Sequence, residues 1–252
     1  MEKVLKIAIA QCPVQDGSIS ANIESVIFYI EAAAQKGVDL IVFPEKFLTG
    51  YIPNLIEANI EKYTFQSQDS RLEPIRQCCN QHKIIALIGA PTRLSNKIYV
   101  STLIFQPFKE EEIYHKNHLY HTEIPLFYES KEAKIITVKG WKIGLGICYD
   151  TAFPEHISTL AQRGCHAYVA SSLFSKGNGY KESRLWFPIR AKDNHIFTVM
   201  SNHVGFTGGW ETCGSSAAWN PKGELIKEAS PSGPELLLVN LDAKEFRSIN
   251  LK

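Results

Sequence analysis

The pattern of apolar and polar positions at the start of the chain predicts a strand, a helix and a second strand. An apolar run from Lys6 to Gln11 is typical of a buried strand. Apolar residues then recur at helical spacing between Ile23 and Gln35, and Gly37 suits the end of that helix because glycine tolerates positive φ. A short apolar run from Asp39 to Pro44 follows. A strand, a helix and a strand within about forty residues indicate an α/β protein.

The same periodicities continue along the rest of the chain. Helical spacing predicts helices over residues 70–82, 155–164 and 180–194. Apolar runs predict strands over residues 84–89, 98–105, 113–115, 133–138, 141–147, 167–171, 196–202, 214–219 and 235–240, with the last two at sheet edges. No internal repeat, low-complexity tract or linker separates these elements. Residues 1–252 are therefore expected to form a single layered domain.

Composition narrows the possible functions. The chain has 252 residues, 44% of them hydrophobic, and a formal net charge of +1. It contains no basic block that would suggest a nucleic-acid partner, and no apolar run approaches the ~18 residues that a membrane span requires. Its first residues lack the pattern of a signal peptide. The six cysteines form no CxxC motif, which favours reduced thiols and a cytoplasmic location.

One stretch, from Trp141 to Glu155, carries the clearest candidate for a reactive residue. Its apolar run ends at Cys148 and is broken by Gly144 and Gly146. Glycines at such positions let backbone or substrate approach closely. A thiol at the end of a rigid strand, facing a loop, is where a nucleophile would lie. The alternative is a buried, inert cysteine that packs as a small hydrophobe.

Glu45 and Lys116 resemble Cys148 in their placement, since each of the three residues lies at or just past the end of a predicted strand. In α/β sheets, sites form at that edge. Taken singly, a glutamate there is commonly a helix cap and a lysine is commonly a surface charge. Together they offer a reaction, because a carboxylate can take the proton of a thiol and an ammonium group can stabilise an oxyanion.

Three sequence blocks in order carry a resemblance to a known family. They are FPEKFLTGY, which contains Glu45; YHKNHL, which contains Lys116; and GICYDTAFPE, which contains Cys148. Supporting segments run from IAIAQCPV near the start to CGSSAAWNPKGE near the end. On these motifs the chain resembles the nitrilase superfamily of carbon–nitrogen hydrolases over almost its whole length.

The resemblance implies an α-β-β-α sandwich that assembles as a homodimer or larger homo-oligomer, without a cofactor. It also implies a thiol hydrolase that cleaves a small linear amide or carbamoyl compound through a thioester and releases ammonia or an amine. Cys148 would be the nucleophile, Glu45 the proton carrier, and Lys116 with the backbone N–H of Tyr149 the oxyanion donors. A second glutamate is expected to orient the lysine; Glu123 is the first choice and Glu129 the alternative.

The expected substrate pocket departs from the family pattern. Tyr149 and Phe174 are expected to bind substrate, although Phe174 stands where many members have tryptophan. Ala152 replaces a frequent arginine, which weakens the case for recognition of a substrate carboxylate at that position. Glu182 and Ser183 fall where a His-Trp pair is frequent. The substrate itself cannot be read from these positions.

Other signals favour structure over chemistry. His115, His118 and His121 are not expected to converge on a metal ion, and no metal site is predicted; His118 is expected to be a structural hydrogen-bonding residue. The glycine-rich stretch Gly205–Gly209 is expected to form a mobile loop near the mouth of the site. Three further functions stay open: N-acyl transfer, hydrolysis of a nitrile, and ligand binding by a catalytically silent member of this fold.

Overall fold

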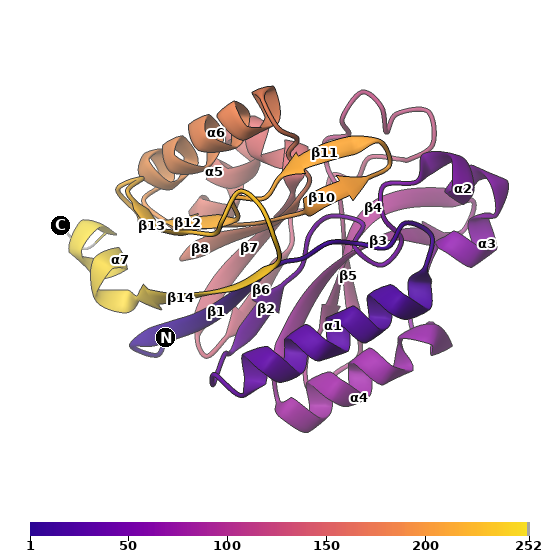
Figure 1. Ribbon diagram of the computed structural model, residues 1–252. Coiled ribbons are helices and arrows are strands. Elements are labelled where there is room, and N and C mark those ends of the chain that lie inside the picture. The colour runs from indigo at the N-terminus through magenta and orange to yellow at the C-terminus, as the bar shows by residue number, and fades with distance from the viewer. Residues whose placement is uncertain (251–252) are drawn as a thin grey trace.

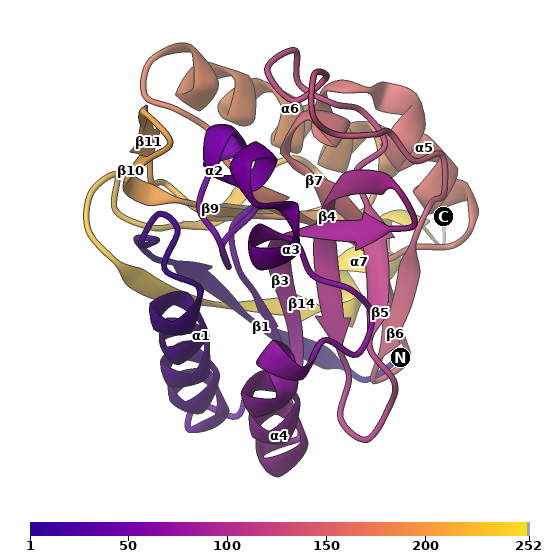
Figure 2. The same cartoon turned by 90° about the vertical axis from the view of Figure 1, so that its right-hand side faces the viewer.

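Two β-sheets lie face to face at the centre of the molecule, and a pair of helices covers the outer side of each sheet (Figures 1 and 2). The computed structural model describes residues 1–250. Helices α1 (Ile19–Ala34) and α4 (Glu73–His82) cover one sheet, and α5 (Pro154–Gln162) and α6 (Asn178–Asn194) cover the other. This four-layered arrangement confirms the expected α-β-β-α sandwich.

The first sheet has the strand order β14-β1-β2-β3-β4-β5. Its parallel centre pairs β1 with β2 and β2 with β3. The remaining strands add antiparallel neighbours on both sides. The bounds are β1 (Val4–Gln11), β2 (Leu40–Val42), β3 (Ile85–Leu94), β4 (Lys97–Phe105), β5 (Glu112–His115) and β14 (Glu235–Asp242).

The second sheet has the order β13-β12-β9-β8-β7-β6, with β7, β8 and β9 parallel. The expected strand over 214–219 is shorter, and its position at a sheet edge was wrong: it is β12, between β9 and β13. The edge strand β13 escaped prediction because its exposed side chains follow no core pattern. The bounds are β6 (Ile135–Val138), β7 (Trp141–Ile147), β8 (Ala167–Ser172), β9 (Phe197–Asn202), β12 (Ala217–Trp219) and β13 (Leu225–Glu228).

The strands are apolar on both faces because both faces are buried. In β1, Ile7 and Ile9 pack in the layer between the two sheets, whereas Ala8 and Ala10 face α1 and α4. In β8, Val169 lies in the central layer and Tyr168 faces α5 and α6. Each fully buried branched side chain contributes about 1.5–3 kcal/mol. Continuous apolar runs of this kind are typical of a sheet that is covered on both sides.

Several short elements were not expected from the sequence. They are α2 (Pro53–Ala58), α3 (Ile60–Tyr63), β10 (Val204–Thr207), β11 (Trp210–Cys213) and α7 (Ala243–Asn250). The 3-10 turn η1 (Ser70–Leu72) begins the helix expected over residues 70–82, and the 3-10 turn η2 (Cys148–Ala152) lies between the expected strand 141–147 and the expected helix 155–164. The glycine-rich stretch expected to be a loop is instead part of the β10–β11 hairpin. The N–H of Gly208 donates to the Asp16 carboxylate at 2.8 Å and fixes the turn. Within residues 1–250, none of the helices has the length and apolarity to cross a bilayer.

Candidate active site

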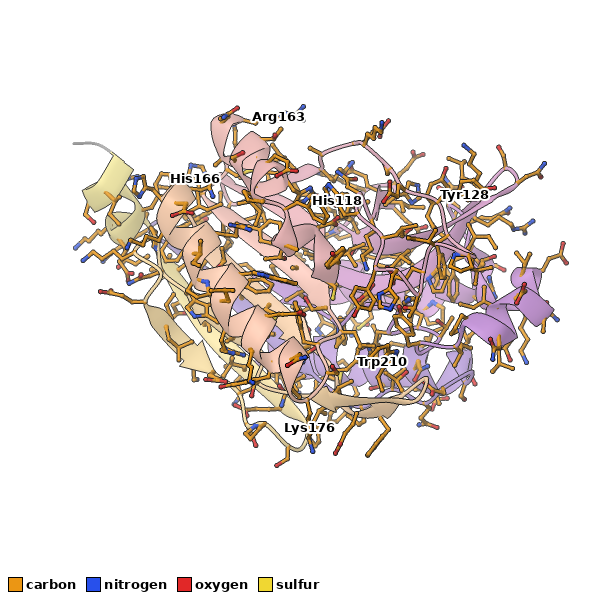
Figure 3. The ribbon with its side chains drawn as sticks, turned by 90° about the horizontal axis from the view of Figure 1, so that it is seen from above. His118, Tyr128, Arg163, His166, Lys176 and Trp210 are labelled. Atoms are coloured by element: carbon orange, nitrogen blue, oxygen red, sulfur yellow. The ribbon has the colours of Figure 1, made fainter. Side chains whose placement is uncertain are left out.

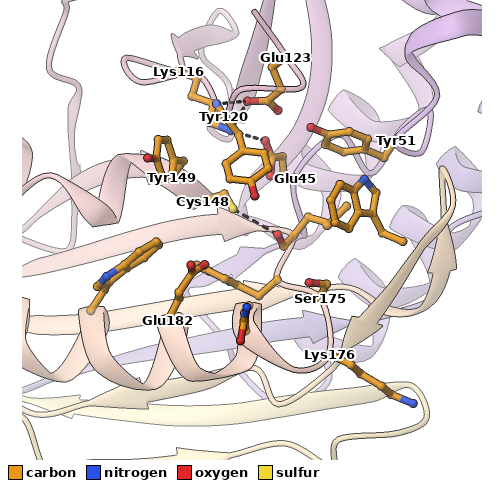
Figure 4. Close-up of a pocket in the computed structure, with 16 residues that line it drawn as sticks. Glu45, Tyr51, Lys116, Tyr120, Glu123, Cys148, Tyr149, Ser175, Lys176 and Glu182 are labelled. Carbon is orange, nitrogen blue, oxygen red and sulfur yellow. Dashed lines mark hydrogen bonds and ion pairs between the residues drawn. The ribbon is translucent and has the colours of Figure 1, made fainter.

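All six residues that the sequence singled out line one cavity of about 380 Å³ (Figure 4). Glu45 follows β2, Lys116 follows β5 and Cys148 follows β7. The first two strands belong to one sheet and β7 to the other, so the cavity lies where the ends of both sheets meet. Glu123, Tyr149 and Phe174 complete the set. The structure therefore brings the expected residues together, and their roles remain predictions.

Glycines at two positions give the site segments room to pass. A Cβ atom on Gly89 of β3 would lie 2.2 Å from the carbonyl oxygen of Pro44 and 2.5 Å from the amide nitrogen of Lys46. No side chain fits there, so Gly89 is required for the chain at Glu45 to run against β3. A Cβ atom on Gly146 would lie 1.8 Å from the hydroxyl oxygen of Tyr168. This glycine therefore accommodates a packed tyrosine next to the cysteine.

Cys148 adopts a backbone conformation that is unusual for its residue type. Its φ is +42°, in the left-handed region. The residue opens η2 directly at the end of β7, and its thiol donates a hydrogen bond to the carbonyl oxygen of Leu173 at 3.3 Å. Strained conformations of this kind cluster at functional sites, where the surrounding structure holds them. The sharp turn presents the sulfur to the cavity.

Asp150 holds the cysteine turn against the segment that follows Lys116. Its carboxylate accepts hydrogen bonds from the N–H groups of Ile147 at 2.9 Å, Asn117 at 3.1 Å and His118 at 2.8 Å, and from the Tyr114 hydroxyl at 2.7 Å. Two segments from different sheets thus share one buried anchor. Sequence reasoning missed this residue, although a buried aspartate directly after Cys148-Tyr149 offers such acceptors to neighbouring turns.

Four buried charged side chains form a compact network beside the sulfur. Lys116 Nζ lies 2.8 Å from Glu45 Oε1 and 2.6 Å from Glu123 Oε2, and Lys46 Nζ lies 2.9 Å from Glu123 Oε1. Each of the four residues is only 1% exposed. Charges buried this deeply require partners, and two carboxylates with two ammonium groups balance. The Tyr120 N–H also donates to Glu123 Oε2 at 2.9 Å.

Lys46 is the member of this network that the sequence analysis missed. It has a positive φ of 51°, and its ammonium group lies 3.2 Å from the centre of the Tyr51 ring, a cation–π contact. Lys46 itself does not line the cavity. The signal that could have revealed it is a lysine enclosed by apolar residues in FPEKFL, since a lysine in a buried run needs an acid.

Burial and charge set the protonation of these groups. Burial, partly offset by Lys116, raises the pKa of Glu45 to about 7. Burial opposes the charge on Lys116, but the two glutamates outweigh it and raise its pKa well above the usual value. Burial also raises the pKa of the Cys148 thiol. The thiol is therefore protonated near neutral pH, and it needs a base before it can act as a nucleophile.

Of the two candidates for the second glutamate, the structure places Glu123 against Lys116. Glu129 instead accepts a hydrogen bond from the Leu119 N–H at 3.2 Å and lines a different hollow. Phe174 lies at the cavity wall, where its backbone N–H donates to the Asn202 side chain at 2.7 Å. That contact fixes the segment that provides the Leu173 carbonyl.

The three histidines near Lys116 have separate surroundings. His115 lies 2.8 Å from the Ser101 hydroxyl. His118 hydrogen-bonds Asp150 at 3.1 Å and stacks on Phe153, as expected for a structural residue. Figure 3 shows that His118 and Trp210 lie on different parts of the molecule, with Lys176, which precedes α6, on the side of Trp210.

Comparison with known proteins identifies the family. The carbon-nitrogen hydrolase family model matches residues 6–250. Omega-amidase NIT3 of Saccharomyces cerevisiae is 26% identical, with 98% of this chain and 90% of the relative covered. Omega-amidase NIT2 of Homo sapiens is 27% identical, with 91% of this chain and 86% of the relative covered. An (R)-stereoselective amidase of a Pseudomonas species is 27% identical, with 89% of this chain and 81% of the relative covered.

Solved structures agree on the fold. The NitN amidase from Nesterenkonia sp. AN1 superposes with a TM-score of 0.87 at 23% identity, covering 98% of this chain and 96% of that one. A cysteine-to-alanine mutant of the same amidase, solved in complex with butyramide, gives a TM-score of 0.86 over 98% and 94%, also at 23% identity. The chain therefore belongs to the carbon–nitrogen hydrolase family of the nitrilase superfamily, and it is a hydrolase of carbon–nitrogen bonds other than peptide bonds.

Proposed function

We propose that this enzyme hydrolyses a small linear amide or carbamoyl compound through a thioester on Cys148. The overall reaction of an amide adds water and yields a carboxylic acid and ammonia, or an amine if the nitrogen carries a substituent. The observation that carries the proposal is the meeting of a thiol, a buried carboxylate and a buried ammonium group in one cavity. We further propose that the whole chain acts as one catalytic unit.

The first step is proton transfer from the thiol. At rest the thiol hydrogen points at the Leu173 carbonyl, and in the reaction it turns to Glu45, which faces the same cavity. Ionised Glu45 takes the proton while the sulfur attacks the carbonyl carbon. The pKa of Glu45, raised to about 7, suits a general base that works near neutral pH.

The second step is stabilisation and collapse of the tetrahedral intermediate. The carbonyl oxygen becomes an oxyanion, which the Lys116 ammonium and the backbone N–H of Tyr149 stabilise. Protonated Glu45 then gives its proton to the leaving nitrogen. The carbon–nitrogen bond breaks, ammonia or an amine departs, and a thioester remains on Cys148. Glu123 holds Lys116 in place through the 2.6 Å contact.

The third step releases the acid. Water enters the position of the departed amine, and Glu45 takes one of its protons as it attacks the thioester carbon. The oxyanion forms again at the same donors. The carbon–sulfur bond breaks, the sulfur recovers the proton from Glu45, and the carboxylic acid leaves.

Relatives support this course of reaction. A mutant of the Nesterenkonia amidase carries the acetamide moiety of fluoroacetamide covalently at its active-site cysteine. The curated relatives named above are amidases. Another relative, from Pyrococcus abyssi and 26% identical, is named a nitrilase.

A turnover assay tests the proposed function. Butyramide should release ammonia and butyric acid in the presence of the enzyme, and mass spectrometry of the protein during turnover should find a butyryl group on Cys148. Butyronitrile and an added primary amine are included, so that nitrile hydrolysis and N-acyl transfer show their own products. The proposal fails if no amide in a broad set of small amides releases ammonia.

The acidic limb of the pH–rate profile should report the base. Because Glu45 acts only when ionised, and because burial raises its pKa to about 7, kcat/KM should rise with pH through this region. Well below that pH it should fall about tenfold for each pH unit, as for one essential ionisation. Ammonia release measured from pH 5 to pH 9 checks this prediction. If kcat/KM did not change with pH below neutrality, Glu45 would be excluded as the general base.

The Lys46→Met variant should shift that limb to higher pH. The positive charge of Lys46 lowers the pKa of Glu45, so its removal lets the pKa rise further. The surface variant Lys109→Met is the control, since Lys109 hydrogen-bonds Gln106 and lies outside the cavity. A limb that stays in place in Lys46→Met would show that the buried lysine has no influence on the base.

We propose a homodimer or larger homo-oligomer and a cytoplasmic location. The exposed side chains of Leu185 and Ile189 on α6 offer an apolar patch for a second copy, and light scattering measures the assembly. All six cysteines are free thiols, which supports a reducing compartment, and cell fractionation checks the location.

A further inference from the structure

The charges around the cavity do not balance. Glu45 and Glu123 are both bound to Lys116. The only other lysine on the wall within residues 1–250, Lys176, pairs with Glu211 at 2.6 Å, and its ammonium group points away from Cys148 (Figure 4). A third carboxylate, Glu182, also lines the cavity. Across residues 1–250, no lysine, arginine or histidine forms an ion pair with it.

Glu182 is directed at the reacting centre by its place on α6. Asn178, Glu182 and Trp186 are spaced four apart, share one face of the helix and all line the cavity. Figure 4 shows the side chain of Glu182 rising from α6 toward Cys148. The carboxylate therefore belongs to the cavity wall opposite the buried network, and it is open to a ligand.

Aromatic rings accompany this carboxylate. The rings of Tyr120 and Tyr149 lie 5.3 Å apart, and those of Tyr149 and Trp186 lie 6.1 Å apart. Burial raises the pKa of Tyr120, and the negative charge of Glu182 raises it further, as expected for neighbours. Aromatic faces attract cations. A free carboxylate among such rings favours a positively charged group and repels a negative one.

The cavity also lacks a fixed cation for a substrate carboxylate. Position 152 is alanine, and Arg190 donates to the carbonyl oxygens of Thr151 at 3.1 Å and Ala152 at 2.8 Å. Within residues 1–250, no arginine lines the cavity. Lys116 is held by two glutamates. An anionic substrate tail would therefore meet a net negative wall.

We propose that Glu182 binds the cationic end of the substrate, so that the preferred substrates are short linear amides that carry a primary ammonium group at the end opposite the amide. This inference rests on the proposed amide hydrolysis and specifies its substrate class. The amide carbonyl lies at Cys148 and Lys116, and the ammonium group lies between Glu182 and the aromatic rings.

Three amides of similar length separate the charge types. They are 5-aminopentanamide, which is cationic; hexanamide, its neutral counterpart; and glutaramic acid, which is anionic at neutral pH. The cationic amide should have a kcat/KM about tenfold above that of hexanamide, from one ion pair and one cation–π contact. Glutaramic acid should be the poorest. Equal values for the three, or preference for the anion, would overturn the inference.

The Glu182→Gln variant should lose the ion pair but keep the cation–π contact, so that the ratio of cationic to neutral kcat/KM falls from about tenfold to about threefold. Glu155→Gln is the matched control, because Glu155 is an exposed carboxylate on α5 outside this cavity, and the ratio should stay at its original value. A ratio of cationic to neutral kcat/KM that is unchanged in Glu182→Gln would contradict the assignment.

A binding measurement separates this inference from the proposed function. Calorimetry with Cys148→Ala should show binding of 5-aminopentanamide that weakens about threefold on adding Glu182→Gln. Wild-type hydrolysis of hexanamide, in contrast, depends only on the proposed chemistry. Failure of hexanamide hydrolysis with intact, Glu182-dependent binding counts against the proposed function. Hexanamide hydrolysis without Glu182-dependent binding counts against the substrate class.

Discussion

The Cys148→Ala variant is expected to lose amide hydrolysis by at least about 10⁴-fold, because without the sulfur no thioester can form and the water reaction lacks a nucleophile of comparable strength. Its fold should persist, since the thiol makes only one hydrogen bond, to Leu173. Ammonia release from butyramide, measured beside a thermal unfolding curve, checks both parts.

The control for this variant is Cys78→Ala, which removes a thiol from α4 on the far side of the first sheet. It should keep its activity within about twofold, since surface and distant changes rarely reach a site. Substantial turnover by Cys148→Ala, with folding intact and no contaminating enzyme, would refute the thioester course.

The Lys116→Met variant should be affected almost as strongly, with a loss of about 10³-fold in kcat/KM at neutral pH. One charged oxyanion donor disappears, which alone costs about 10²–10³-fold. In addition, Glu45 loses the cation that keeps its pKa from rising further, so less of the base is ionised. The free energy of unfolding should drop by about 3 kcal/mol, because two buried carboxylates are left with Lys46 alone.

The measurements for Lys116→Met are steady-state rates and urea unfolding, made where the variant is folded. Lys139→Met is the control, since Lys139 pairs with Asp39 at 2.6 Å on the surface and lies outside the cavity. It should change the free energy of unfolding by about 1 kcal/mol at most. Activity of Lys116→Met within tenfold of the wild type would exclude Lys116 as the oxyanion donor.

The ends of β2 and β7 were predictable from the sequence because both strands are apolar on both faces. The runs before Glu45 and Cys148 mark β2 and β7 clearly, and the family blocks then connect them with Lys116. What the runs do not encode is which sheet each strand joins. That the cysteine and the glutamate come from different sheets emerges only from the packing of the two sheets on each other.

Lys46 and Asp150 could not be read in the same way, since their importance depends on partners far away in the chain. Lys46 pairs with Glu123, which lies 77 residues later in the chain. Its neighbour Glu45 pairs with Lys116, and nothing in the local sequence indicates that these two pairs form one network. Asp150 collects donors from the segment around Asn117. Short elements such as β13 and α3 were missed because a few residues carry too little periodicity.

The position of the carboxylate on one sheet and the sulfur on the other has a mechanical consequence. In the proposed mechanism the proton passes between groups carried by the two sheets, and the apolar side chains packed between these sheets, such as Val42 and Val169, set the distance between the sheets. Because protein interiors are densely filled and yield little to compression, these side chains act as a spacer of fixed thickness. The distance between the proposed base and the sulfur thus depends on the apolar layer between the two sheets.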